Sequence, residues 1–518
     1  MSRLSGNKGI VILIILGVLG ATALIFFYAS QQDVELKITD DISGCDWLGS
    51  TDLFDSISIK EVLIGKDKEN SRIFCYIPEQ NNGKKIKLTF VSNSDRYKLN
   101  EAVEIVSDYD EICHIAVRCA GRKFCFDIVF TNLPITVIES NKNRSFIDDS
   151  KENETEARLR ISEEGFVYGF YDIPSEIKLH GNTSLKFPKK AYKVSFSEKQ
   201  IQSINGMHKV NSLILDAAYT DQSRIRNLLC SRIWTDISAS STFNLSLEGF
   251  FTEVFYNSEY LGIYICKTPV NRTGLGLEKS TSTSTPVVLK ADSWINNMDS
   301  GTSYYGVSDE NAYGFEIKYP NDKKLVSKAW FSILPELAEF YDSNAKKTYE
   351  LTNSVFEIEN YINVKLLNLL VCNTDNQLSK NNYFFKAALD SEDIYIIPWD
   401  MDLTLGLAWS NKEEDDEFDS ALVPETAEVI QGFFLQPDSP EIEEAMKQRW
   451  VELRNSILTN DYFKTLIEEY SHTLSLGSAE REKEKWGYPE DVSLEIEYVE
   501  RWLALRIATI DEFAESSK

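Results

Sequence analysis

An apolar run that ends in two aspartates constrains this chain more than any other feature of its sequence. The run Ile394–Ile397 is typical of a buried strand, and the stretch "PWDMDLTLG" that follows carries Asp400 and Asp402. Residues i and i+2 of an extended segment project to the same side, so the two carboxylates converge. Two anions held together need a cation or a shared proton. A divalent metal is the simplest partner, and the alternative is a solvated loop with two unrelated acids.

The composition indicates a folded protein of more than one domain. The chain has 518 residues, of which 43% are hydrophobic, and this excludes global disorder and favours two or three domains. The net charge of −27 argues against nucleic acid or anionic lipid as a partner, because both require a basic face. A cationic protein partner is compatible with this charge.

The N-terminus predicts a membrane anchor. Residues 9–28 carry no charge and would span about 30 Å as a helix, which is enough to cross a bilayer. Tyr28 stands where a signal peptidase site would need a small residue, so we expect an uncleaved transmembrane helix. Arg3 and Lys8 precede the span, and the positive-inside rule therefore leaves residues 1–8 in the cytoplasm and the bulk of the chain outside.

Two folded regions are expected after the span. Residues 34–130 contain short alternating apolar runs separated by polar turns, which predicts a β-sandwich module of immunoglobulin-like size. Residues 131–515 form a second, mixed region, whose part beyond Ala421 has apolar residues at helical spacing. The predicted fold class is α+β with a helical C-terminal part.

Cysteines are compatible with an oxidising compartment. There are eight, and Cys113, Cys119 and Cys125 flank a turn-like "AGRK" between two apolar runs. The pattern is compatible both with a cross-strand disulfide near this turn and with buried free thiols.

The segment before the two aspartates has the order of a kinase active site. A predicted helix, "YINVKLLNLLVC", runs into a loop with Asp375, then Asn381 and Asn382, then an apolar strand, a turn and the strand that ends at the aspartates. Protein kinases supply a catalytic Asp, a metal-binding Asn and a second metal-binding Asp in this order. The alternative for Asp375 is an acid that ends the helix through local backbone bonds.

Phosphoryl transfer also requires a basic group, which the sequence offers upstream. Gly181 permits a close backbone approach, Ser184 adds a hydroxyl, and Lys190 and Lys193 follow on a predicted strand. A lysine-rich edge strand without catalytic meaning is the competing interpretation of these lysines.

Six spaced motifs, together with the tail elements "RW..LR" and "RWLALR", resemble the CotH kinase family, the spore-coat protein H type. The resemblance covers roughly residues 130–515 and rests on "IKLHGNTSLKFPKKAYKVSF", "DQSRIRNLL", "YLGIYI", "FEIKYPND", "NTDNQLSKNNYFFK" and "IIPWDMDLTLG". It implies an atypical protein-kinase-like domain that binds ATP and Mg²⁺ and phosphorylates Ser or Thr of proteins, with Ser-rich, basic substrates in its best-known branch.

The resemblance implies roles for individual residues. Asp375 would be the catalytic aspartate, Asn381 or Asn382 the metal-binding asparagine, and Asp400 the metal-binding aspartate with Asp402 as its second carboxylate. Lys190, with Lys193 in reserve, would meet the phosphates. The other expected cofactor-binding residues are Gly181, Ser184, Arg226 and Lys318, of which Arg226 and Lys318, together with Asn227, would brace the site.

Two departures from the family pattern bear on activity. Family members usually read "RGNS" where this chain has His180–Thr183, and they often have a Glu near Cys266–Thr268. We therefore carry three functions forward: an outward-facing protein kinase, a catalytically idle surface scaffold or adhesion protein, and nucleotidyl transfer by the same metal site. Scarce extracellular ATP favours the scaffold, whereas the retained Asp375, Asp400 and Lys190 favour the kinase.

Overall fold

The computed structural model describes residues 32–197, 201–281, 284–292, 298, 311–342, 345–373, 375–376, 378, 380–409, 418–419, 439–488 and 491–515. The expected transmembrane segment, residues 9–28, lies outside these ranges. Within them, no helix combines the length and the apolar character that crossing a membrane requires.

The chain forms two compact units, each assembled from several stretches of sequence. The first contains Met1–Glu139, Arg160–Asp172 and Glu253–Leu261, and the second contains Ser140–Leu159, Ile173–Thr252 and Gly262–Lys518.

Two β-sheets build most of the first unit. One has the strand order β4-β5-β10-β9-β1-β7, with β2 paired to β10 outside this path, and the other has the order β3-β6-β8. The elements are β1 (Gln32–Ile38), β2 (Asp46–Trp47), α2 (Asp52–Ser56), β3 (Ile57–Ile59), β4 (Ile64–Asp67), β5 (Arg72–Tyr76), β6 (Lys85–Ser92), β7 (Tyr97–Lys98), β8 (Asn100–Val106), β9 (Cys113–Cys119) and β10 (Arg122–Thr131).

Aromatic side chains join the two sheets. The ring of Phe126 on β10 lies 6.2 Å from that of Phe90 on β6 and 6.3 Å from that of Phe54 on α2, measured between centroids. All three are buried, and β6 alternates buried and exposed residues as a strand with one covered face does. Two sheets therefore pack face to face here, and an immunoglobulin-like topology stays a prediction.

A second aromatic cluster brings later parts of the chain into the same unit. Strand β11 (Ile135–Ser140) pairs in parallel with β16 (Gly249–Tyr256). Phe255 and Tyr260 pack on Phe74 of β5, with ring centroids 5.0 and 5.1 Å away. The core of this unit thus contains residues from both sides of the expected boundary at residue 131.

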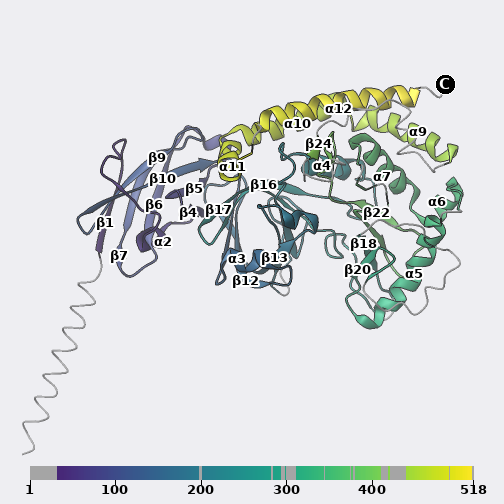
Figure 1. Ribbon diagram of the computed structural model, residues 1–518, viewed down its shortest axis with the longest axis horizontal. Coiled ribbons are helices and arrows are strands. Elements are labelled where there is room, and N and C mark those ends of the chain that lie inside the picture. Colours follow the sequence, from purple (N-terminus) through teal and green to yellow (C-terminus); the bar gives the residue numbers. More distant parts are fainter. Residues whose placement is uncertain are drawn as a thin grey trace, which may run out of the picture. The chain divides into compact units, whose positions relative to one another are not determined.

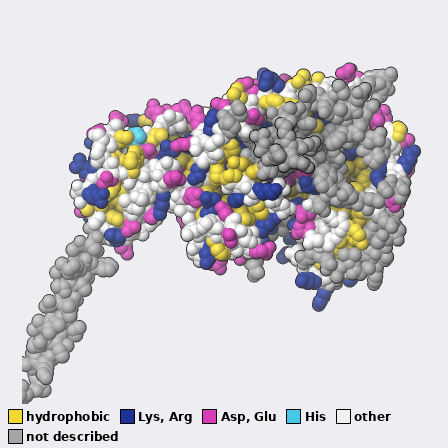
Figure 2. Space-filling view, viewed as in Figure 1, with side chains coloured by type: hydrophobic (Ala, Val, Ile, Leu, Met, Phe, Trp, Pro, Cys, Tyr) yellow, Lys and Arg dark blue, Asp and Glu magenta, His cyan; other side chains and the backbone are white. Residues whose placement is uncertain are grey.

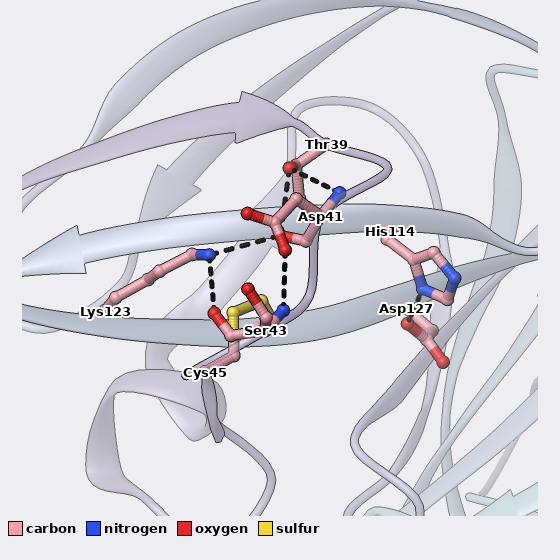
Figure 3. The surroundings of a disulfide bond; sticks show 8 residues. Thr39, Asp41, Ser43, Cys45, His114, Lys123 and Asp127 are labelled. Carbon is pink, nitrogen blue, oxygen red and sulfur yellow. Dashed lines mark hydrogen bonds and ion pairs between the residues drawn. A yellow bond between two sulfur atoms is a disulfide. The ribbon is translucent and has the colours of Figure 1, made fainter.

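A disulfide between Cys45 and Cys125 spans 80 residues of the first unit. Cys125 lies on β10, and Cys45 lies in the segment that enters β2. In Figure 3, Lys123 reaches from β10 to this segment, where its amino group donates to the carbonyl oxygens of Asp41 and Ser43 at 3.1 Å each. The bridge and the lysine together fasten an otherwise irregular segment to the sheet.

The three cysteines that flank the "AGRK" turn thus differ in their bonding. Cys113 and Cys119 are free thiols, whereas Cys125 is bonded to a distant partner. Cys125 faces Ala116 across the β9–β10 ladder, so no cysteine of β9 stands opposite it.

Within the described residues, the second unit contains two larger sheets, the two-stranded sheet β23-β24 and a set of helices (Figure 1). Strands β13, β14, β15 and β17 pair antiparallel in that order, and a five-stranded sheet has the order β19-β20-β18-β21-β22. The remaining bounds are β12 (Thr155–Ser162), β13 (Phe170–His180), β14 (Ala191–Phe196), β15 (Ser212–Asp216), β17 (Glu259–Lys267), β18 (Val287–Ala291), β19 (Asn311–Ala312), β20 (Phe315–Tyr319), β21 (Asn382–Lys386), β22 (Tyr395–Pro398), β23 (Ala408–Trp409) and β24 (Phe418–Asp419).

The helices of the second unit lie mostly in its C-terminal half. They are α3 (Arg144–Asp149), α4 (Arg226–Ile237), α5 (Lys323–Tyr341), α6 (Tyr349–Val355), α7 (Ile358–Val371), α9 (Pro440–Ser456), α10 (Asn460–Ser475), α11 (Ser478–Trp486) and α12 (Val492–Glu515), with the 3₁₀ turn η2 (Thr183–Lys186) before β14. The predicted α+β class with a helical C-terminal part is confirmed.

Helix α12 shows how the C-terminal helices support the rest of the unit. Its buried residues, among them Ile496, Val499 and Leu503, recur at helical spacing. Arg506 is buried and donates two hydrogen bonds, of 3.0 and 2.7 Å, to the carbonyl oxygen of Leu369 in the last turn of α7. A cation at a helix C-terminus satisfies carbonyls that have no intrahelical partner. The end of α7 is therefore fixed by α12.

Charges of both signs share the surface. On the face drawn in Figure 2, Lys and Arg side chains of the described residues lie among Asp and Glu side chains.

The disulfide yields a stability prediction. Reducing the Cys45–Cys125 bond should lower the free energy of unfolding of the first unit by about 4 kcal/mol, because an 80-residue loop regains its freedom in the unfolded chain. Urea unfolding with and without dithiothreitol measures this, and the Cys45→Ala/Cys125→Ala variant should match the reduced protein. Cys113→Ala, which removes a free thiol, is the control. Equal midpoints in both redox states would contradict the prediction.

Candidate functional site

The segment after β22 is anchored on both sides of its aspartates. The backbone N–H of Trp399 donates to the carbonyl oxygen of Asn381 at 2.8 Å, and the backbone N–H of Leu405 donates to the carbonyl oxygen of Val371 at 2.8 Å. Asp400 is exposed and Asp402 is half-buried, whereas Met401 and Leu403, on either side of Asp402, are buried. Asp400 has a φ of +59°, a left-handed conformation that few non-glycine residues adopt without a local reason. The aspartates are thus held at a fixed turn.

Asp375 lies in the loop that follows α7. The helix ends where Cys372 turns left-handed, with a φ of +52°. Lys380 Nζ donates to both carboxylate oxygens of Asp375, at 2.7 and 2.9 Å, and Asn381 Nδ2 donates to Oδ2 at 2.8 Å. The carboxylate is therefore oriented by two neighbours from its own loop.

The two candidate asparagines have different environments. Asn382 is fully buried and exchanges amide hydrogen bonds with Asn376, at 2.8 and 3.0 Å. Asn376 also accepts from Asn368 on α7 at 3.2 Å, so this pair fastens the loop to the helix. Asn381, with a φ of +54°, instead meets Asp375. Asn381 is thus the asparagine in contact with Asp375, and Asn382 fastens the loop; which of the two would hold a metal stays a prediction.

An ion pair that we did not predict stands beside the aspartates. Lys267 at the end of β17 lies 2.7 Å from Asp216 at the end of β15, and its amino group sits 4.6 Å from the centre of the Trp399 ring. Asn227 on α4 donates to the same Asp216 oxygen at 2.8 Å. Asp402 accepts from the hydroxyl of Thr220 at 3.2 Å. The ends of β15, β17 and β22 thus bring their polar residues together.

The sequence held a signal for this pair. Asp216 ends the apolar run "SLILD" as Asp400 follows "YIIP", and Lys267 ends another apolar strand. In all three cases, a charged residue at or just after the end of a buried apolar run belongs to the candidate site. Only the pairing of β15 with β17, in which Leu215 faces Cys266, could show that two of them meet.

The carboxylates of the site repel one another. Asp400 is partly exposed to solvent, but the protein atoms packed around it desolvate its carboxylate and raise its pKa. Lys267 opposes that rise, whereas Asp216 and Asp375 add to it. Burial, then Asp400 and Asp216, raise the pKa of Asp402 to about 8. Asp216 differs, because Lys267 lowers its pKa against the effect of burial. Lys267 and Lys290 both oppose the rise at Asp400, yet its pKa stays raised, so additional positive charge would be stabilised here.

A histidine on the rim of this group stays neutral. Burial, followed by the charge of Lys267, lowers the pKa of His180 to about 3. His180 therefore presents an uncharged imidazole at neutral pH.

The residues fit a magnesium ion that is shared with a ligand. Among the described side chains, no three His, Cys, Asp or Glu residues come together as a metal-binding group. Asp400, with its uncompensated neighbour Asp402, and the amide oxygen of Asn381 are oxygen donors of the kind Mg²⁺ takes. In proteins Mg²⁺ is usually held by one or two carboxylates and by phosphates and water, so a complete protein cage is not required.

The glycine loop closes on itself. Gly181 has a φ of +96°, and a Cβ added there would lie 2.0 Å from Ser184 Oγ, so the hydroxyl packs where only glycine leaves room. Lys190 Nζ donates to the carbonyls of Leu185 and Phe187 at 2.6 Å each. Lys190 thus holds the turn η2 in the conformation observed here.

The remaining predicted residues lie at different places. Lys193 is half-buried on β14, where burial, followed by Lys178 and Lys318, lowers its pKa. Lys318 on β20 pairs with Glu316 at 2.5 Å. Their assignment as cofactor-binding residues stays a prediction.

Arg226 is a brace, as its position in "DQSRIRNLL" allows. It is buried, its Nη1 donates to Asp221 at 2.6 Å, and its Nε donates to the carbonyl of Thr404 at 3.1 Å. Arg226 therefore ties the start of α4 to the chain that follows Asp402.

The raised pKa of Asp402 predicts a pH dependence. A carboxyl whose pKa is higher in the folded state favours folding when protonated, so its contribution is lost as pH rises from about 4 to about 8. Asp402→Asn should therefore raise the melting temperature of the ligand-free protein, more at pH 8 than at pH 4. Thermal unfolding at the two pH values measures this, and Asp390→Asn is the control. A gain that is larger at pH 4 would show that the sign is wrong.

Comparison with known proteins is consistent with this geometry. No curated protein matches the chain. The model of the family described as CotH kinase protein matches residues 177–510, which is well over half of the chain and includes the loop of Asp375, both aspartates after β22, helix α4 and most of α12. By this match, the chain belongs to the CotH kinase family.

Proposed function

We propose that this protein is an atypical protein kinase that transfers the γ-phosphate of ATP to Ser or Thr of proteins. The observation that carries the proposal is the convergence of Asp375, Asn381 and Asp400 on the β21–β22 hairpin, since Trp399 donates to the carbonyl of Asn381 while Asn381 donates to Asp375. Membership of the CotH kinase family supports a kinase-like protein. Transfer to Ser or Thr is our inference.

Each residue has a distinct part in the proposed reaction. Asp375 accepts the proton of the substrate hydroxyl, held in orientation by Lys380 and Asn381. Asp400 and Asn381 would hold Mg²⁺, which neutralises phosphate charge when it is bound with ATP. Lys267 stands at the aspartates, paired with Asp216, and would meet the phosphates. Lys190 would act through the shape of the glycine loop, because its amino group is engaged by carbonyls of that loop.

The compartment and partners extend the proposal. We infer a single-pass membrane protein with residues 1–8 in the cytoplasm, residues 9–28 in the membrane and the bulk of the chain outside. The Cys45–Cys125 disulfide supports an oxidising compartment. A chain of net charge −27 suits a basic, Ser-rich protein substrate and not a nucleic acid.

One observation favours the idle scaffold. Lys380 occupies both carboxylate oxygens of Asp375, so a substrate hydroxyl would have to compete with an ion pair. The same site could also transfer a nucleotide, because the metal chemistry is shared.

Labelled ATP separates the three functions. The ectodomain, incubated with Mg²⁺ and a basic Ser-rich protein, should incorporate label from the γ-phosphate and none from the α-phosphate. Asp400→Asn, which removes a charge without changing size, should abolish incorporation and magnesium-dependent nucleotide binding while the protein stays folded. Label from the α-phosphate would instead establish nucleotidyl transfer. Incorporation of neither label, with any added protein, would leave the scaffold.

Asp375 should affect turnover and not nucleotide affinity. Asp375→Ala should reduce kcat by roughly 10²-fold or more, because a positioned base acts chiefly in the transition state. The Kd for ATP, measured by calorimetry, should change little. Asp390→Ala, in the turn between β21 and β22, is the control. A folded Asp375→Ala protein with full phosphotransfer would reject the catalytic role of this loop.

A further inference from the structure

A buried carboxylate on a C-terminal helix meets the lysine that precedes Lys190. Glu482 of α11 and Lys189 have no solvent-exposed side-chain surface, and Lys189 Nζ lies 2.5 Å from Glu482 Oε1. The residues are 293 positions apart in the sequence. Both also bind Ile263 of β17, since Lys189 donates to its carbonyl at 2.5 Å and Glu482 Oε2 accepts its N–H at 2.8 Å. In Figure 1, α11 accordingly lies beside β17.

The strand β17 is shaped to admit this carboxylate. Gly262 has a φ of +95°, and a Cβ built on it would lie 2.0 Å from Glu482 Oε2 and 3.0 Å from the indole nitrogen of Trp486. No other residue type fits there without displacing the carboxylate. The backbone conformation and the acid therefore depend on each other.

A second buried cation faces the same carboxylate. Arg224 Nη2 lies 3.5 Å from Glu482 Oε1, and the arginine is itself buried. Its Nη1 donates to the carbonyls of Ala218 and of Asp221, the latter at 2.8 Å, and its Nε and Nη2 have no hydrogen-bond partner. Glu482 is the nearest counter-charge to this guanidinium among the ion pairs of the described residues.

These contacts converge on two loops of the candidate site. One is residues 181–190, which contains the glycine turn and ends at Lys190. The other is residues 218–226, which contains the Thr220 hydroxyl that meets Asp402 and the Arg226 brace. The loops touch where Phe187 stacks on Tyr219, with ring centroids 5.3 Å apart. Glu482 holds the first loop through Lys189 and the second through Arg224.

We propose that Glu482 is a positioning residue, whose carboxylate keeps these two loops in place around the phosphates of a bound nucleotide. The proposal deepens the function given above and rests on it where activity is concerned. It also gives Lys189 a structural partner in place of a phosphate.

Removing the charge of Glu482 leaves two buried cations without their counter-ion. Burial lowers the pKa of Lys189 to about 8, and Glu482 is the first group that opposes this shift. Without the carboxylate, Lys189 would lose its proton or draw water into the core. Arg224 cannot be deprotonated, so its charge would remain buried without a counter-ion. Both loops should then loosen while the rest of the unit stays folded.

The test compares Glu482→Gln with Glu480→Gln, an exposed acid on the same helix. Below the unfolding temperature, Glu482→Gln should raise the KM for ATP by roughly tenfold or more and change kcat by less than about threefold. A merely structural role would reduce the amount of active protein, which lowers the apparent kcat and leaves KM unchanged. Glu480→Gln should leave both constants unchanged.

Hydrogen exchange without nucleotide tests the loops independently of activity. Glu482→Gln should increase exchange in residues 181–190 and 218–226, whereas Glu480→Gln should not. Lys189→Met, which leaves Glu482 paired with Arg224, should increase exchange in the first loop alone and serves if Glu482→Gln does not fold. If the wild-type protein neither binds ATP nor transfers phosphate, the proposed function fails, and the exchange data still judge Glu482. Unchanged exchange in both loops, or loss of ATP binding in Lys189→Met with unchanged exchange, would overturn the proposal.

Discussion

Mutual repulsion among carboxylates is the constraint on which the second unit depends. Asp216 at the end of β15 lies near Asp400 and Asp402, which follow β22, and Lys267 at the end of β17 is a neighbouring cation. Such a group is unfavourable in a protein that binds nothing, so the surrounding chain must over-determine its geometry. The left-handed Asp400, the buried residues on either side of Asp402 and the Arg226 brace all serve this purpose. The stability lost here is what a cationic ligand would restore.

The family motifs have separate physical tasks. The loop after α7 orients Asp375, whereas "DQSRIRNLL" supplies Asp221 and Arg226, which fix the chain after Asp402. The tail element "RWLALR" supplies Arg506, which satisfies the carbonyl of Leu369 just before the loop of Asp375 begins. Motifs far from the chemistry thus hold the ends of the elements that carry it. Their wide spacing along the chain follows from this division of tasks.

Local pattern predicted the elements and their order better than their contacts. Helical spacing identified α9 and α12, and the apolar runs identified β21 and β22, because each signal lies within one stretch of chain. The Asp216–Lys267 pair and the Cys45–Cys125 bond join residues 51 and 80 positions apart, and no local signal encodes such a pairing. The different partners of Asn381 and Asn382 also required the fold, since they depend on which amide Asn376 engages.

The long disulfide loop has a mechanical consequence. A chain pulled from its two ends transmits tension through the bond between Cys45 and Cys125, which are 80 positions apart, so the residues between them bear no load even if their sheets come apart. Those residues would otherwise add about 270 Å of contour length on unravelling, at roughly 3.4 Å each. In a protein fixed at one end and bound to a partner at the other, the residues inside the disulfide loop would therefore not add to the extension of the chain. Under reducing conditions the same force would also unravel the loop, and the chain would extend further before its full tension acted on the partner.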